Sequence, residues 1–400
     1  MKPKSATSGF IVAFGLAAFL AALWFVRAAG LDPVTAVIAV IGATSAANFI
    51  PDILILKVHR RATTGLDWSI SRFSFQRVQI KLMGLAGTVA AVGVMYWLFP
   101  EYRGEFYDSY WTFLKTIVPV WLVCAVPYFF VVDAKMTEPE DGYYQMGQAV
   151  LLHFEKIDKP KLAQHALGWL VKAFFLPLMI TYFMQGLAKF AAFDFSSIVS
   201  FKTFFDFSYD SIFLVDVGIV SVGYIMSMRI FDTHLRWAEP TLKGWIVALI
   251  CYQPFWSLFG RLYAEYATDY AWGAWLGEET PLYMIWGSLI LILYGIYVWA
   301  SVMFGCRFSN LTNRGILTNG PYAFTKHPAY LSKNLAWWLS SVPFVAQGGA
   351  GEALRRCLLL GMLNYIYYLR AKTEEAHLRQ DPAYVDYEKW IEKKGLFRFL

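Results

Sequence analysis

Residues 9–29 read GFIVAFGLAAFLAALWFVRAA, and Arg27 is the only charged residue among them. A hydrocarbon layer about 30 Å thick is crossed by a helix of about 20 apolar residues, so this run is long enough to span a bilayer. The run is also too long for the apolar part of a signal peptide, and no convincing small-residue cleavage site accompanies it. We therefore expect a retained first transmembrane helix.

Composition extends this expectation to the whole chain. Of its 400 residues, 58% are hydrophobic, 18% are aromatic and only 16% are charged. These values exclude an ordinary soluble domain and predict an all-α, polytopic transmembrane helical bundle of about ten helices. The predicted spans are 9–29, 34–56, 82–99, 111–132, 168–192, 211–230, 244–260, 283–305, 328–347 and 352–371.

The distribution of charge between the predicted loops indicates their orientation. Residues 57–81 are rich in Lys and Arg, whereas residues 100–110 and 261–282 are mainly acidic, the latter through Glu265, Asp269, Glu278 and Glu279. Because basic loops stay in the cytoplasm, we expect both termini there. The same alternation predicts that the loop containing Arg314 and the tail after Arg370 face the cytoplasm.

The remaining composition excludes several classes of site. A net charge of +6 is spread over many loops, which suits contact with anionic lipid headgroups but not a nucleic-acid interface. The cysteines lie in apolar segments at wide spacings, so we expect no disulfide framework and no metal site. They are Cys124, Cys251, Cys306 and Cys357.

Residues 320–330, GPYAFTKHPAY, form the first of two polar segments near the C-terminus. Gly320 and Pro321 predict a turn, and Pro328 suits the first position of a helix with His327 as its cap. Free N–H groups at such a helix start attract an anion. The polar residues that follow at helical spacing predict either a cavity lining or hydrogen bonds between helices with aromatic packing.

The second polar segment contains Arg370 and the pair Glu374-Glu375. Asn364, Tyr368, Ala371 and Glu375 recur at helical spacing and predict one polar face that ends in an acid. Arg370 and Glu374 are one turn apart, and an intrahelical ion pair would explain both. Glu375 points about 100° away from Glu374, so it is the stronger candidate for binding a ligand.

Together, Gly320-Pro-Tyr322, Lys326-His-Pro-Ala-Tyr330, Arg370 with Glu374-Glu375, and Tyr384-x-x-Tyr387 resemble the C-terminal signature of the isoprenylcysteine carboxyl methyltransferase and phospholipid methyltransferase superfamily. The resemblance covers roughly residues 283–400. It implies an integral-membrane enzyme that binds S-adenosylmethionine in a cytoplasmic pocket made by the last helices and the tail. The acceptor would be a lipid-like or prenylated molecule that enters from the bilayer.

Carried over to this chain, the resemblance implies a set of site residues. Arg370 and Glu375 are the expected catalytic residues, with Arg370 orienting the acceptor or the cofactor. The chain departs from the family pattern at two positions. Lys326 replaces an arginine before His-Pro, which keeps the charge but loses the bidentate fork, and Ser332-Lys333 stands where the family has glycine. The residues implied for cofactor binding are Gly320, Pro321, Tyr322, His327, Pro328, Tyr330, Glu374 and Glu375.

Methyl transfer to a membrane-embedded acceptor is therefore the expected function, carried by a core over residues 241–400. Residues 1–240 would supply transmembrane helices of unknown role. A carboxylate acceptor needs only a cation to steer it, whereas an amine must first lose a proton to Glu375, Glu374 or His327. Two alternatives stay open: an NADPH-dependent membrane sterol or lipid reductase, and a non-enzymatic lipid transporter whose polar pathway includes Asp216.

Overall fold

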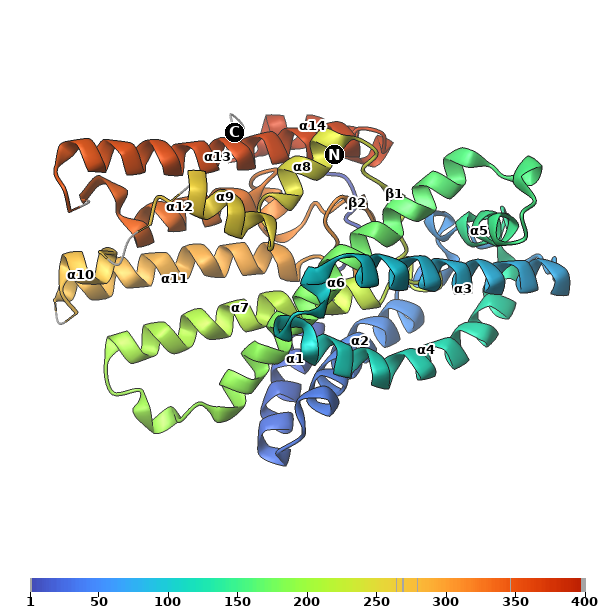
Figure 1. Ribbon diagram of the computed structural model, residues 1–400, viewed down its shortest axis with the longest axis horizontal. Helices are drawn as coiled ribbons and strands as arrows, with labels where there is room; N and C mark the ends of the chain where they lie inside the picture. The colour runs from blue at the N-terminus through green and yellow to red at the C-terminus, as the bar shows by residue number, and fades with distance from the viewer. Residues whose placement is uncertain (1, 264, 268–269, 279, 346, 397–400) are drawn as a thin grey trace.

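The computed structural model describes residues 2–263, 265–267, 270–278, 280–345 and 347–396. Over these ranges the chain forms fourteen α-helices and one two-stranded antiparallel ladder, which confirms the predicted all-α class (Figure 1). Asp269 and Glu279, two acids of the predicted outer loop, lie outside the described residues.

The elements follow in chain order. The α-helices are α1 (Gly9–Ala29), α2 (Pro33–Leu54), α3 (Phe75–Leu98), α4 (Asp108–Lys135), α5 (Gly142–Val150), α6 (Lys159–Ala192), α7 (Phe201–Ile225), α8 (Leu242–Leu249), α9 (Phe255–Tyr263), α10 (Trp272–Leu276), α11 (Pro281–Val302), α12 (Pro328–Ser341), α13 (Ala350–Leu378) and α14 (Pro382–Lys394). The strands are β1 (Trp237–Ala238) and β2 (Thr312–Asn313). The 3-10 helices are η1 (Val58–Arg60), η2 (Ala62–Thr64), η3 (Pro100–Arg103), η4 (Glu105–Tyr107), η5 (Phe154–Lys156), η6 (Phe195–Ser197), η7 (Gly305–Arg307), η8 (Gly320–Ala323) and η9 (Pro343–Val345).

Seven of the described helices are long and apolar enough to cross a membrane: α1, α2, α3, α4 with the preceding η4, α6, α7 and α11. They correspond to seven of the ten predicted spans. Helix α7 begins at Phe201, ahead of the predicted span 211–230. Ser200 and Thr203 form a capping box there and satisfy N–H groups at the helix start.

The other three predicted spans have a different form. Segment 244–260 is divided into α8 and α9 around Pro254, which has no N–H to donate and interrupts the helix. Segment 328–347 ends early, because α12 stops at Ser341 before Pro343. Segment 352–371 lies inside α13, which continues through a charged stretch to Leu378. The expected ten spans thus correspond to seven uninterrupted spans and three shorter or more polar segments.

Helix α7 connects the two parts of the bundle, because it packs against both α6 and α11. β1 pairs with β2 in antiparallel register, Trp237 opposite Asn313 and Ala238 opposite Thr312. Helix α13 packs on α8 and α12 (Figure 1). The predicted division at residue 240 stays a prediction, and extensive contacts cross it.

The charged insert of residues 133–164 folds back onto the bundle. It contains the short helix α5, Gly142–Val150. Helix α5 lies so close to α3 that a Cβ added at Gly84 would collide with the carbonyl oxygen of Tyr143. Glycine is therefore required at this contact.

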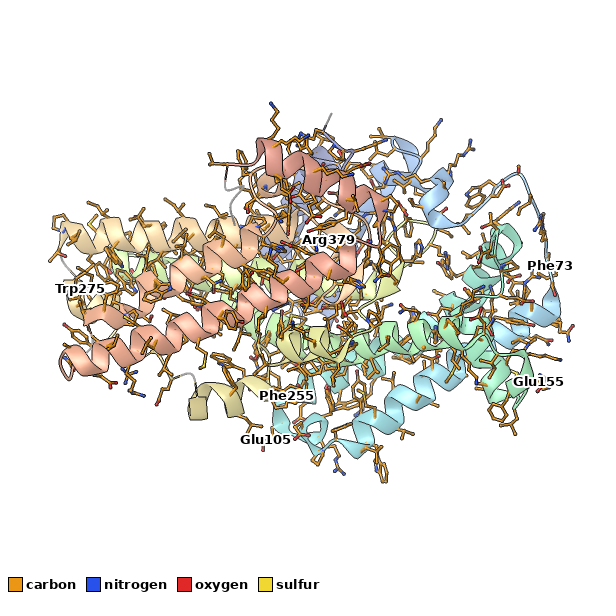
Figure 2. All side chains as sticks on the ribbon, turned by 90° about the horizontal axis from the view of Figure 1, so that it is seen from above. Phe73, Glu105, Glu155, Phe255, Trp275 and Arg379 are labelled. Carbon is orange, nitrogen blue, oxygen red and sulfur yellow. The ribbon has the colours of Figure 1, made fainter. Side chains whose placement is uncertain are left out.

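Two charged segments lie at the same end of the molecule. Figure 2 shows Phe73, from the basic loop 57–81, and Glu155, from the charged insert, at the end opposite Trp275 of α10, whereas Arg379 of the predicted cytoplasmic tail lies nearer the middle. The assignment of that end to the cytoplasm stays a prediction.

Candidate functional site

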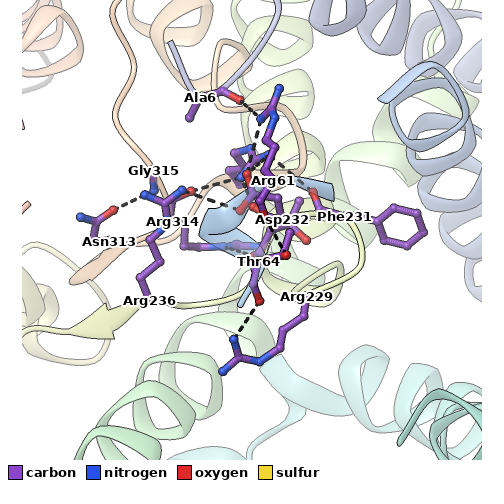
Figure 3. A network of polar contacts seen from close by, with 12 residues as sticks. Ala6, Arg61, Thr64, Arg229, Phe231, Asp232, Arg236, Asn313, Arg314 and Gly315 are labelled. Atoms are coloured by element: carbon purple, nitrogen blue, oxygen red, sulfur yellow. Dashed lines mark hydrogen bonds and ion pairs between the residues drawn. The ribbon is translucent and has the colours of Figure 1, made fainter. Parts of the chain in front are cut away.

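Two buried arginines hold the segment that connects α11 to α12. Arg314 donates hydrogen bonds to five backbone carbonyls, including those of Gly223 and Met226 at the end of α7. Arg307 donates to the carbonyl of Asp232 and lies 3.4 Å from its carboxylate. Figure 3 shows Arg314 and Asp232 within this network. Because carbonyls at a helix end have no partner in the helix, these contacts fix the segment on the N-terminal half.

The N-terminal residues bind the same segment from the other side. The Ala6 amide donates to the carbonyl of Ile316 at 2.8 Å, and the Ser5 hydroxyl donates to the Asn319 side chain at 2.9 Å. The N-terminal residues thus hold the chain in place just before the turn at Gly320. The predicted turn itself is present as η8, and Gly320 has a φ of +57°.

Helix α12 begins where the sequence predicts, with Pro328 at its first position. His327 occupies the capping position, but its side chain makes no capping hydrogen bond. Its Nε2 instead lies 3.1 Å from Oε1 of Glu375. The predicted capping position of His327 is therefore confirmed, while its side chain contacts Glu375 and not the free N–H groups of the helix.

Helix α13 presents a different face to the site from the predicted one. Tyr367, Arg370, Glu374 and His377 line a cavity of about 120 Å³. Successive steps of 100° place these four side chains on one side of the helix. The predicted face does not line this cavity: Tyr368 is 54% exposed, and Asn364 bonds to Trp338 and Asn334 on α12.

Glu375 is buried in a cluster of cations and does not line the cavity. Only 1% of it is exposed, and its carboxylate oxygens lie 3.2 Å from Lys326, 3.0 Å from Lys372 and 3.6 Å from Arg379. Burial alone would raise the pKa of the Glu375 carboxyl, but His327 and the neighbouring lysines hold that pKa well below its usual range. Glu375 therefore stays ionised and orients the groups around it.

Glu374 is the acid of the pair that faces the cavity. Its side chain is 41% exposed, and it accepts a 2.8 Å hydrogen bond from the Tyr330 hydroxyl. The Tyr330 ring in turn stacks on the ring of His327 at 5.5 Å between centroids. This gives Glu374 a fixed orientation while leaving it accessible to a ligand.

Arg370 forms no ion pair with Glu374 among the described residues, so the expected intrahelical pair is not the arrangement here. Its Nη2 donates to Oδ1 of Asn310 at 2.7 Å, and the guanidinium lies over the rings of Tyr252, Tyr330 and Tyr367. Such an aromatic enclosure attracts the cation without neutralising it.

Several cavity residues were not found by sequence reasoning. Glu239 and His377 are both buried, with Nδ1 of His377 3.4 Å from Oε2 of Glu239. Burial lowers the pKa of the His377 imidazole, which favours the neutral form. Helical spacing from Arg370 could have indicated His377, but nothing in the sequence indicates Glu239 or Asn310, which precede both polar segments.

The structure thus brings together most of the predicted site residues. Those that line the cavity are Tyr322, His327, Pro328, Tyr330, Arg370 and Glu374, together with the two departures Lys326 and Lys333. Gly320 and Pro321 shape the preceding turn. Glu375 does not line the cavity but orients residues that do.

No protein-family model matches the chain, and comparisons with curated proteins and with solved structures find no match either.

Proposed function

We propose that this protein is an integral-membrane methyltransferase that uses S-adenosylmethionine to methylate a lipid-like or prenylated acceptor. The observation that carries the proposal is the convergence of the polar segments. Tyr322, His327, Tyr330, Arg370 and Glu374 come from two distant parts of the chain and line one cavity. That cavity adjoins α11, a helix apolar enough to lie in a bilayer.

The groups in the cavity fit the parts of S-adenosylmethionine. Glu374 suits a ribose hydroxyl or an ammonium group, and the aromatic side chains Phe304 and Phe308 suit a purine ring. The electron-rich faces of Tyr322 and Tyr330 favour a sulfonium cation. When bound, this cofactor supplies a methyl group that is already activated for transfer.

The protein's own contribution is then to position the reactants and exclude water. Glu374 and Tyr330 hold the cofactor end, and Arg370 orients the acceptor. Glu375 acts as a positioning residue, since it holds His327 and Lys326 in place. Where the acceptor is an amine, Glu374, His327 or His377 lies in the cavity to take its proton.

Binding of S-adenosylhomocysteine, the demethylated product, tests the cofactor assignment. We expect the detergent-solubilised protein to bind it in isothermal titration calorimetry, and Glu374→Gln to weaken binding at least about 30-fold, because a charged hydrogen-bond acceptor is lost. Lys189→Met is the matched control, since Lys189 lies on the exposed side of α6 in an ion pair with Asp210. No binding by the parent protein, or saturable binding of NADPH in its place, would contradict the proposal.

Identification of the acceptor tests the reaction itself. Membranes that contain the protein are incubated with S-adenosylmethionine labelled in its methyl group, and the lipids are extracted and identified by mass spectrometry. We expect label in a lipid or prenylated species with the parent protein and none with Glu374→Gln. Equal labelling by both proteins would refute the proposed site.

A further inference from the structure

One wall of the cavity is made by residues outside the motifs on which the family resemblance rests. Glu239 directly follows β1, and Thr312 belongs to β2, which pairs with β1. The Glu239 amide donates a hydrogen bond to the Leu311 carbonyl at 2.8 Å, so the ladder fixes Glu239 beside the cavity. His377, which lies about two turns after Arg370 on α13, completes this wall.

Polar atoms in this wall have unused hydrogen-bonding capacity. Nδ1 and Nε2 of His377 and Oγ1 of Thr312 are buried and have no hydrogen-bond partner among the described residues. Oε1 of Glu239 accepts hydrogen bonds from the amide and the hydroxyl of Thr241, whereas Oε2 accepts none from the described part of the chain. Because a buried polar group without a partner is costly, a ligand that supplies these partners is favoured.

The imidazole of His377 and the carboxylate of Glu239 lie side by side. Nδ1 of His377 is 3.4 Å from Oε2 of Glu239, and the two atoms do not form a hydrogen bond with each other. Burial lowers the pKa of the His377 imidazole, which favours the neutral ring with one N–H donor. The wall therefore offers one donor and one acceptor to adjacent atoms of a ligand.

Aromatic side chains line the cavity next to this wall. Phe304 and Phe308 both line it, and Phe308 lies four residues before Thr312 on the segment that leads into β2. The two phenyl rings meet edge to face, with 5.3 Å between their centroids. Such rings favour a flat heterocycle, whose polar edge then pairs with the donor and the acceptor of the wall.

We propose that Glu239 and His377 recognise the edge of an adenine ring. The carboxylate accepts a hydrogen bond from the exocyclic N6 amine, and the imidazole donates one to N1. Adenine carries this donor and this acceptor on adjacent positions, whereas hypoxanthine has a carbonyl oxygen and an N–H in their place. The inference rests on the proposed S-adenosylmethionine cofactor for the identity of the nucleoside, but recognition of the base does not require methyl transfer.

Ligands that differ only at this edge test the proposal. S-Adenosylhomocysteine is compared with the corresponding derivatives of inosine and of purine riboside, by isothermal titration calorimetry on the detergent-solubilised protein. Inosine replaces the N6 amine by a carbonyl oxygen, and purine riboside lacks the amine but keeps N1. We expect the inosine derivative to bind at least about 30-fold more weakly, because its carbonyl oxygen faces the Glu239 carboxylate.

Two variants assign the role of each residue. Glu239→Gln places an amide there that can donate or accept a hydrogen bond, so it should reduce the preference for adenine over hypoxanthine to within about 3-fold and leave the purine riboside derivative unaffected. His377→Phe keeps a flat ring but no donor, and it should weaken the adenine and purine riboside derivatives about 10-fold. Glu374→Gln should keep the parent's preference, and Lys189→Met should match the parent throughout.

Three outcomes would overturn adenine recognition. They are equal binding of the adenine and hypoxanthine derivatives by the parent, an unchanged preference in Glu239→Gln, and no binding of either S-adenosylhomocysteine or adenosine. Adenosine is titrated separately, because it carries the base without the homocysteine part. Glu239-dependent binding of adenosine without binding of S-adenosylhomocysteine would support the adenine site and refute the proposed methyl transfer alone.

Discussion

Replacement of Glu375 by glutamine, compared with the same replacement of Glu374, distinguishes the roles of the two adjacent acids. The change keeps the size of the side chain and removes the charge at the centre of the cluster formed by Lys326, His327, Lys372 and Arg379. We expect a large loss of stability. Glutamine at position 374 should leave stability nearly unchanged and weaken cofactor binding at least about 30-fold.

The expected magnitude follows from the exposure of each partner. The lysine at 372 and the arginine at 379 are about half exposed, and such ion pairs contribute roughly 0.2–1 kcal/mol each. Lys326 and His327 are largely buried, and breaking a buried pair costs about 3–5 kcal/mol. Because Lys326 keeps Glu388 at 3.8 Å, we expect Glu375→Gln to destabilise the protein by about 3 kcal/mol, the lower end of that range.

The assay is the free energy of unfolding from a denaturant titration in detergent micelles, followed by circular dichroism. Glu374→Gln is the matched control, because glutamine can still accept the Tyr330 hydrogen bond, and its effect should be about 0.5 kcal/mol or less. A loss below about 1 kcal/mol for Glu375→Gln would refute the assigned supporting role. So would an equal loss for the Glu374 variant.

Three further predictions concern pH and packing. Since the pKa of Glu375 is lowered in the folded state, its contribution to stability is complete above the unfolded value of about 4.3 and is lost as pH falls from there toward the folded pKa. Between about pH 4.5 and pH 3, the unfolding free energy of the parent should therefore fall more than that of Glu375→Gln. Gly84→Ala should cost about 1–3 kcal/mol in the same titration because its methyl group meets the Tyr143 carbonyl, whereas Gly93→Ala on the same helix meets nothing within 4 Å and should be neutral. Arg314→Lys should cost about 2 kcal/mol or more, because an ammonium cannot reach all five carbonyls; a stability equal to the parent's would contradict its anchoring role.

Apolar runs alone predicted most of the membrane-spanning helices. Each of the seven spans is long enough that hydrophobicity decides its structure without reference to neighbours. The predicted span 244–260 divided at Pro254, which shows the limit of counting apolar residues without regard to proline. The start of α12 at Pro328 was predictable for the same local reason.

The candidate site was predictable only in part. Residues 320–330 and 370–375 were recognised as the polar segments, and both contribute to the cavity. Which acid faces the cavity was not predictable, because Glu374 and Glu375 differ only by the rotation of α13 against its neighbours. The contribution of Glu239 and Asn310 depends on the β1–β2 pairing, which joins segments far apart in the chain.

The sequence by itself determined that the chain is a helical membrane protein, and it located two polar segments near the C-terminus. Both properties follow from local composition and short-range spacing. Only the tertiary structure decided that Glu375 is enclosed by cations, that Glu374 and His377 face the cavity, and that Lys333 and Arg370 line it together. These properties depend on how α11, α12 and α13 pack together, and packing is set by contacts between residues that are remote in sequence.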